Sequence, residues 1–239
     1  MISAQAIAGL PEIQPGDDLA ALLAGHAQAG DVLVLAHKIV SKAEGRIRAL
    51  SDIAPGDAAR AYAQKLGKDA RHVQAVLDES TEVLRDERVL ICRTRHGFVC
   101  ANAGVDQSNA PANSVILLPE DPDASARRLR AALPERPAVV VADSFGRAWR
   151  VAQCDVAIGV AGLAPVEDWQ GRPDRSGRDL HATAIAIADE AAAAADLARA
   201  GKDAGEPAVV VRGLERFVTE DDGPGAAALI RSRADDLFL

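Results

Sequence analysis

The feature that most constrains the fold is a set of three short, uninterrupted apolar runs, Val32–Leu35, Val139–Val141 and Val209–Val211. A run of aliphatic residues without polar alternation is typical of a strand buried on both faces. Segments with helical character lie between these runs, but no regular strand–helix–strand repeat connects them. The sequence therefore predicts an α+β protein in which mixed sheets pack against helices.

The remaining segments are assigned from their capping and turn residues. Gly67 is expected to break a helical stretch, and residues 89–104 predict a β-hairpin. The strands at 137–146 and 154–162 are expected to be short, with abrupt polar ends. A polar, glycine-rich loop is expected at 166–180. Helices are expected at 15–30, on both sides of Gly67 within 55–86, at 121–133, at 181–202 and at the end of 221–239.

Length and composition exclude several classes of protein. A chain of 239 residues can form one large domain or two small ones with a real core. A net charge of −8 and 3% aromatic residues argue against nucleic-acid binding, which relies on basic surfaces and stacking platforms. No apolar run reaches the roughly 20 residues of a membrane span, and no signal peptide is recognisable. Three cysteines without a Cys-x-x-Cys pair disfavour a disulfide framework or a thiolate zinc site, so a cytoplasmic location is expected.

The common nucleotide-binding and hydrolase motifs are absent from the sequence. There is no G-x-x-x-x-G-K-[ST] loop, no G-x-G-x-x-G after a strand, and no H-E-x-x-H or EF-hand pattern. The stretch ADSFG is close to the nucleophile elbow G-x-S-x-G, but Ala142 replaces its first glycine. A serine hydrolase is therefore disfavoured, and any nucleotide must be held without a Walker loop.

Polar side chains gather directly after four of the predicted strands. Strand ends of this kind are where α/β and α+β proteins usually place ligands. Two clusters combine a carboxylate with hydroxyl or amide oxygens, which suit Mg²⁺ or Mn²⁺. The other two supply cations suited to phosphate, and the combination is what phosphoryl transfer needs. The clusters are Ser41, Lys42 and Arg46; Asn102, Asp106, Ser108 and Asn109; Asp143, Ser144, Arg147 and Arg150; and Arg212–Gly213.

Each cluster also has a purely structural interpretation. Asp106 and Asn109 of the second cluster would cap a turn. Asp143 and Ser144 would cap a helix that begins near Phe145. Lys42 and Arg46 would lie on a solvated helix face. Taken singly these interpretations are the simpler ones, but four such clusters in one chain favour a binding site.

Five long segments together resemble one known family. They are LVLAHKIVSKAEGRI, CANAGVDQSN, the stretch 139–180, TAIAIADEAAAAADLARAGK and PAVVVRGL. In this order they are similar to the GTP-dependent γ-glutamyl ligases of deazaflavin coenzyme biosynthesis, the coenzyme F420-0:L-glutamate ligases. The resemblance runs from about Gly9 to Leu214, and its motifs are long.

The resemblance implies an amide ligase with an unusual α+β ligase fold, usually an intertwined homodimer. GTP would phosphorylate the lactyl-phosphate carboxylate of the deazaflavin coenzyme precursor, F420-0, and the amine of L-glutamate would attack the acyl phosphate. GDP and phosphate would be released, and further glutamates would be joined through γ-linkages. A divalent metal, Mn²⁺ or Mg²⁺, is expected, with K⁺ as an additional ion. Nucleic acid and membranes are not expected partners.

The resemblance also implies roles for residues of this chain. Asp106, Asp143 and Ser144 would bind the divalent metal. The Arg212–Gly213 turn is a weaker candidate for the nucleotide pocket. His37 departs from the family pattern, in which Gln or Ser is frequent at this position, and no residue is assigned to acid–base or nucleophilic catalysis. The residues expected to contact GTP are Leu10, Pro11, Glu12, Ile13, Ser41, Lys42, Arg46 and Asn109.

Residues 1–239 are expected to form a single γ-glutamyl ligase unit, with two closely packed subdomains as an alternative division. Some family members carry a C-terminal nitroreductase-like domain, and none is expected in this chain, which is either free-standing or the first part of a fusion. Two other functions stay open at this point. One is a nucleotide-dependent ligase that adds an amino acid to a different carboxylate. The other is a catalytically silent nucleotide-binding homologue.

Overall fold

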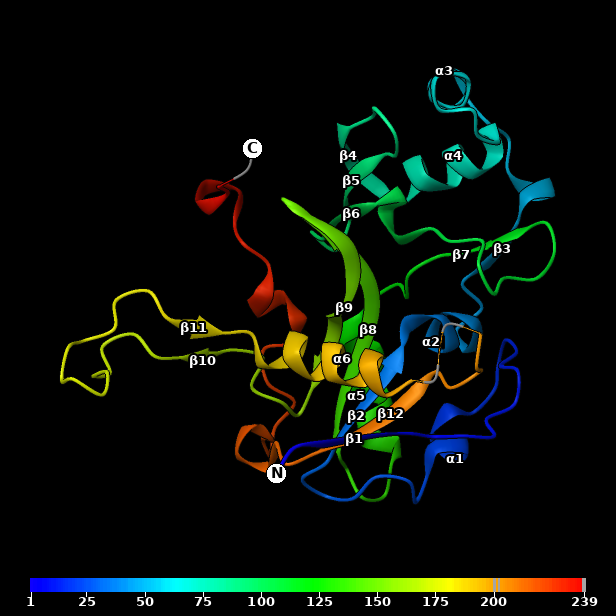
Figure 1. Cartoon of the computed structure of the whole chain (residues 1–239). Coiled ribbons are helices and arrows are strands. Elements are labelled where there is room, and N and C mark those ends of the chain that lie inside the picture. The colour runs from blue at the N-terminus through cyan, green and yellow to red at the C-terminus, as the bar shows by residue number, and fades with distance from the viewer. Residues whose placement is uncertain (200, 202, 238–239) are drawn as a thin grey trace.

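The three apolar runs form adjacent strands of one sheet in the computed structural model, which describes residues 1–199, 201 and 203–237. Among these residues, five strands in the order β1, β12, β2, β8, β9 make the main sheet (Figure 1). Strands β2 and β8 run parallel, and the other neighbouring pairs are antiparallel. The strands are β1 (Ser3–Ala6), β12 (Ala208–Arg212), β2 (Val32–Ala36), β8 (Ala138–Arg147) and β9 (Arg150–Ala161).

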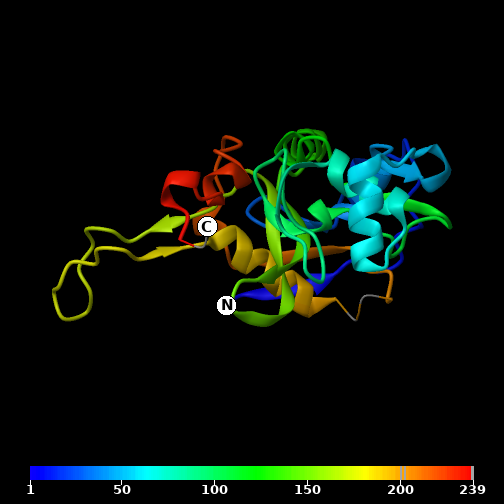
Figure 2. The ribbon, with the colours of Figure 1, turned by 90° about the horizontal axis from the view of Figure 1, so that it is seen from above.

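Helices cover both faces of the main sheet, which confirms the predicted α+β class. The alanine-rich helix α6 packs on one face, and the small side chains of Ala188 and Ala192 allow it to lie close to the strands. The other face packs against α1, α2 and α5, and Figure 2 shows α5 and α6 on opposite sides of the sheet. No helix among the described residues is long and apolar enough to cross a membrane. The helices are α1 (Leu19–Leu23), α2 (His37–Ala43), α5 (Pro122–Ala132) and α6 (Ile187–Ala198).

A second region, between α2 and α5 in the chain, has an apolar cluster of its own and lies above the main sheet in Figure 1. Gly67 adopts a left-handed conformation (φ 64°) and ends the first of its two helices, as predicted. The predicted hairpin is also confirmed, as strands β5 and β6. The elements are β3 (Ile47–Ala49), α3 (Asp57–Leu66), α4 (Ala70–Asp78), β4 (Ser80–Arg85), β5 (Ile91–Thr94), β6 (Val99–Ala101) and β7 (Ser114–Ile116).

Strands β8 and β9 extend well beyond their apolar parts. Strand β8 continues through Asp143 and Ser144 to Arg147, and Ser144 lies opposite Asp155 of β9. No helix begins near Phe145, so the interpretation of Asp143 and Ser144 as a helix cap is wrong. The prediction of short strands fails because pairing with a partner strand, rather than local propensity, keeps this polar segment extended.

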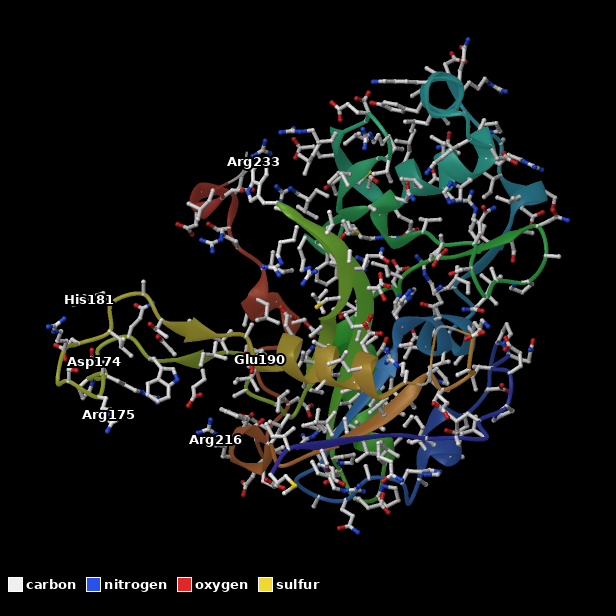
Figure 3. All side chains as sticks on the ribbon, in the orientation of Figure 1. Asp174, Arg175, His181, Glu190, Arg216 and Arg233 are labelled. Atoms are coloured by element: carbon white, nitrogen blue, oxygen red, sulfur yellow. The ribbon has the colours of Figure 1, made fainter. Side chains whose placement is uncertain are left out.

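A long arm projects from the body of the molecule (Figures 1 and 2). Strand β10 (Glu167–Asp168) pairs with β11 (Ala184–Ile185), and the pairing continues outward through a hydrogen bond from Gly171 N to Leu180 O of 2.8 Å. The segment predicted as a loop at 166–180 therefore forms the outgoing side and the tip of an extended ribbon, together with the start of its returning side. Figure 3 shows the labelled side chains of Asp174, Arg175 and His181 at the outer end of this ribbon, away from the body.

The C-terminal segment differs from the predicted terminal helix. Within its described residues the helical turns are short and of the 3₁₀ type, and residues 219–222, which precede η4 and η5, are held by a buried arginine of α5. Arg130 donates to Asp222 Oδ1 (2.7 Å) and Thr219 O (2.8 Å), contacts that favour a loop. Residues 200 and 202 of the predicted helix at 181–202, and 238–239, lie outside the described residues. The 3₁₀ helices are η1 (Leu50–Asp52), η2 (Asn102–Gly104), η3 (Glu215–Phe217), η4 (Ala226–Leu229) and η5 (Arg233–Asp235).

Candidate functional site

Helix α2 begins directly where strand β2 ends; it carries Ser41 and Lys42 of the first predicted cluster, and Arg46 follows it. Lys38, Ser41 and Lys42 are spaced by three and four residues, so they share one face of the helix. Ser41 and Lys42 are buried, with exposed fractions of 0% and 5%. The interpretation of Lys42 as part of a solvated face is therefore wrong.

The predicted GTP-binding segment at 10–13 lies beside this helix. The Lys42 ammonium donates to Glu12 Oε1, and Gly16 N donates to Ala43 O at 2.8 Å. Ile13 is buried in the same apolar cluster as α2, while the side chain of Glu12 is largely exposed. The structure thus brings residues 10–13 together with Ser41 and Lys42, although the segment and the helix are about thirty positions apart in the chain.

Asp143 reaches the same end of the sheet because β8 is parallel to β2. Ala142 lies opposite Ala36, the last residue of β2, so Asp143 follows at the level where α2 begins. His37 of that helix places Nε2 at 3.4 Å from Asp143 Oδ1 and Nδ1 at 3.2 Å from Ser41 Oγ. The imidazole of His37 therefore connects a predicted metal ligand with a predicted nucleotide ligand.

The environment of Asp143 favours a bound cation. Burial raises the pKa of Asp143, against the opposing effect of His37, and burial lowers the pKa of His37 itself. Among the described residues, His37 Nε2 has no hydrogen-bond partner. The Asp143 side chain is 17% exposed, and a carboxylate that is largely out of water beside a neutral imidazole lacks a full positive partner, so a cation would stabilise its ionised form.

Asp106 approaches from the loop after β6 and meets α2 through Lys38. The ammonium of Lys38 donates to Asp106 Oδ2 at 2.6 Å and also to Ser108, which in turn donates to Asp106 through its backbone N at 2.8 Å. Burial alone would raise the pKa of Asp106, but the hydrogen bonds from Lys38 and Ser108 outweigh it and lower the pKa to about 2. Asp106 is therefore charged and already paired with an ammonium group. Asn109 is exposed on the same loop, with φ 57°.

Ser144 is not brought to the same side as Asp143. Adjacent residues of a strand point to opposite faces, and the Ser144 hydroxyl donates to Asp155 Oδ1 at 2.5 Å on the face covered by α6. Asp155 also pairs with Arg199, which follows that helix. The metal-binding role of Ser144 stays a prediction. The buried Asp155–Arg199 pair was not foreseen, since Asp155 sits in an apolar stretch and its partner is 44 positions away.

Arg212 lies at the far end of the main sheet from this site. Strand β12 is antiparallel to β2, so Arg212 ends beside Asp31, and its Nε lies 3.3 Å from Asp31 Oδ2. The structure therefore separates the Arg212–Gly213 turn from α2, Asp106 and Asp143.

The donor set that a metal would use consists mainly of two carboxylates. In the described part of the chain, no group of three or more His, Cys, Asp and Glu side chains is placed to hold a metal ion. Asp143 lies 3.4 Å from His37 and Asp106 lies 2.6 Å from Lys38, so the two carboxylates contact the first two residues of α2. Their hard oxygen atoms fit Mg²⁺ or Mn²⁺ better than a soft metal.

An apolar cavity of about 700 Å³ is lined by residues of β8 that follow Asp143. Phe145, two residues further along β8, lines it together with Phe98 of the β5–β6 turn, and the centres of these two rings are 6.2 Å apart. Cys100 also lines the cavity, and burial together with the charge of Asp143 raises its pKa to about 12. The cavity is large enough for an organic ligand of the size of a coenzyme fragment.

Comparison with known proteins places this chain in a family. Residues 9–213 match the family model described as F420-0:Gamma-glutamyl ligase, which includes every residue assigned to the site. A coenzyme F420:L-glutamate ligase of Natronomonas pharaonis is 46% identical over 99% of this chain and 94% of its own length. Proteins of the same name from Methanopyrus kandleri (44% identical, 95% and 93%) and Methanothermobacter thermautotrophicus (42% identical, 99% and 98%) are similar along nearly their whole length. Since the family model and these relatives cover most of the chain, the protein belongs to the F420-0:gamma-glutamyl ligase family.

Proposed function

We propose that this protein is a GTP-dependent ligase that joins L-glutamate to the lactyl-phosphate carboxylate of F420-0 and then adds further glutamates through γ-linkages. Family membership supports the acceptor and the amino acid. The observation that carries the proposal is the meeting of a buried cation with a partly buried carboxylate at one end of β2 and β8. Lys42 and Ser41 of α2 lie there with Asp143, which His37 links to Ser41.

The proposed reaction has two steps. The terminal phosphoryl group of GTP moves to the acceptor carboxylate, giving GDP and an acyl phosphate. The amine of L-glutamate then attacks the acyl carbon, inorganic phosphate leaves with the bonding electrons, and the amine gives up a proton. Both steps bring anions together, so catalysis depends mainly on positioning and on positive charge.

Separate groups of residues in this chain would supply the positive charge and position the substrates. Lys42 and Arg46 would bind phosphate oxygens, and the exposed segment around Glu12 would border the nucleotide. Asp106 and Asp143 would hold the divalent metal, which when bound neutralises phosphate charge. The cavity lined by Phe98 and Phe145 offers apolar walls for the ring of the acceptor, and Phe145 lies two residues beyond Asp143 along β8.

The function is tested by the products of the purified protein with GTP, Mn²⁺, L-glutamate and F420-0. We expect mass spectrometry to show the acceptor increased by one or more glutamyl units, and GDP release that requires both glutamate and F420-0. GDP release with another carboxylate in place of F420-0 would favour the ligase of different specificity. Nucleotide binding without GDP release under any of these conditions would favour the silent homologue.

We also propose that the protein is a homodimer in which the arm at 167–185 packs against the partner subunit. The arm leaves the body of its own chain, and the residues of its outer part are exposed (Figure 3). A second exposed surface lies at the tip of the β8–β9 hairpin, where Trp149 and Val151 are 89% and 92% exposed. Large apolar side chains left in water at such a tip are typical of a surface that another molecule covers.

Shortening the arm is expected to convert the dimer to a monomer. Gly171 and Leu180 are already paired, so joining them through an Asn-Gly turn removes the outer ribbon and retains the inner one. Light scattering after size-exclusion chromatography measures the molar mass. Arg175→Ser, which keeps the length of the arm, serves as the control and should stay dimeric. An unmodified protein that runs as a monomer, or a shortened one that stays dimeric, would contradict the role of the arm.

A further inference from the structure

Two arginines from separate elements share two carboxylates beside α2. Arg46 follows α2, and Arg95 lies in the turn of the β5–β6 hairpin. Both donate to the same oxygen of Glu79, Oε2, at 2.9 Å from Arg46 Nη2 and 2.5 Å from Arg95 Nη2. Both also contact Glu120, with 3.1 Å from Arg46 Nη1 to Oε2 and 2.8 Å from Arg95 Nη1 to Oε1. The four groups form a closed ring of alternating charge.

The two carboxylates of this ring differ in their exposure. The side chain of Glu79 is 8% exposed, whereas that of Glu120 is 65% exposed. Arg46 Nε also donates to Leu118 O at 2.9 Å, so its guanidinium is held from the protein side. Glu79 holds both guanidinium groups, and the Leu118 carbonyl also holds that of Arg46. These contacts would keep the guanidinium groups in place if another anion replaced the Glu120 carboxylate. Because Glu120 is in contact with water, its ion pairs contribute little stability and can be exchanged.

The side chain of Glu120 is able to leave without a change in the main chain. His96 Nε2 lies 3.0 Å from Pro119 O and 3.1 Å from Glu120 O, so it carries the proton and holds this stretch through its carbonyl groups. The next residue, Asp121, caps α5 by accepting from Ala124 N at 2.9 Å. These contacts anchor the backbone on both sides of the Glu120 side chain.

We propose that Arg46 and Arg95 form a pair that binds a phosphoryl oxyanion of a substrate, and that Glu120 occupies the pair in the free protein. A carboxylate that offers one oxygen to each of two guanidinium groups holds the position that two oxygens of a phosphate would take. The inference rests on the proposed function, in which Arg46 contacts the nucleotide. It adds Arg95 as a second anion ligand and Glu120 as the internal group that the substrate displaces.

The test measures the binding of three ligands by calorimetry, without L-glutamate: inorganic triphosphate, GTP with Mn²⁺, and F420-0. Glu120→Gln keeps the size of the side chain and removes its charge, so at least one ligand should bind about threefold to tenfold tighter. Arg95→Gln should weaken binding of the same ligand at least about tenfold, since it removes a charge-assisted hydrogen bond. Glu82→Gln is the matched control, because Glu82 also lies between two arginines, Arg93 and Arg233, and should change nothing.

The pattern of losses identifies the source of the phosphoryl group. Weaker triphosphate and GTP binding assigns the pair to the nucleotide, and weaker F420-0 binding assigns it to the phosphodiester of the acceptor. Because Arg95→Gln takes one partner from the buried Glu79, its melting temperature is measured too. The Glu120→Gln variant needs no such check, because Glu120 is exposed. If this variant binds all three ligands with unchanged affinity, the proposal is overturned. No turnover is required, so a protein that shows these shifts but forms no amide would contradict only the proposed function.

Discussion

Replacing Asp143 with asparagine is expected to lower the rate of glutamate ligation at least about a hundredfold, the usual scale for losing one well-placed electrostatic group. Asp143 pairs with Val156 of β9 and follows Ala142, the last residue of β8 that pairs with β2, so its backbone is held and its side chain lies beside His37 at the start of α2. Asparagine keeps the size but removes the charge that holds a cation. Steady-state ligation at saturating Mn²⁺ measures the effect.

The same variant should be no less stable than the original protein in the absence of metal. A carboxyl group whose pKa is raised on folding contributes stability below its unfolded pKa and loses it as the pH rises through the folded pKa. Asp143 is such a group, so its replacement should raise the metal-free melting temperature at neutral pH and have little effect near pH 4.

A matched substitution separates loss of function from loss of fold. Asp31 is also buried, but it pairs with Arg212 at the other end of the main sheet. Asp31→Asn should therefore lower stability and leave the ligation rate nearly unchanged. Near-normal turnover of Asp143→Asn at saturating Mn²⁺ would remove Asp143 from the site and weaken the whole metal assignment.

Removing divalent metal is expected to weaken GTP binding at least about a hundredfold, because a metal ion stabilises phosphate charge by several kcal/mol. The cations of the site are already paired: Lys38 with Asp106, and Lys42 with Glu12. With a net charge of −8 on the chain, little positive charge is left for a triphosphate. Calorimetry of GTP binding with Mn²⁺ and with a chelator gives the comparison.

Two controls make the metal experiment specific. Guanosine has no phosphate, so its binding should not respond to the chelator. The Asp143→Asn variant should bind GTP weakly under both conditions, because it has lost one of the two proposed metal ligands. If the unmodified protein binds GTP equally well with Mn²⁺ and with the chelator, the metal does not bridge the nucleotide to the protein.

Much of the fold could be predicted from local features of the chain. Uninterrupted aliphatic runs such as Val32–Leu35 can be buried only between layers, so they identify the central strands. Asp121 and Gly67 mark helix ends through capping and left-handed geometry, which depend on neighbouring residues alone. The family could also be recognised from the sequence, because the five segments that resemble it and their order are properties of the linear chain.

The composition of the site was decided by strand direction and register, which are non-local. The parallel pairing of β8 with β2 brings Asp143 to His37, whereas the antiparallel pairing of β12 carries Arg212 to the opposite end. Strand alternation separates Ser144 from Asp143, although the two are adjacent in sequence. Glu79 and Glu120, the partners of Arg46, lie in distant segments of the chain, so no local sequence pattern predicted these ion pairs. The places of Asp143, Ser144 and Arg212 follow from how the strands of the main sheet pair, and local residue preferences do not determine which strand lies beside which.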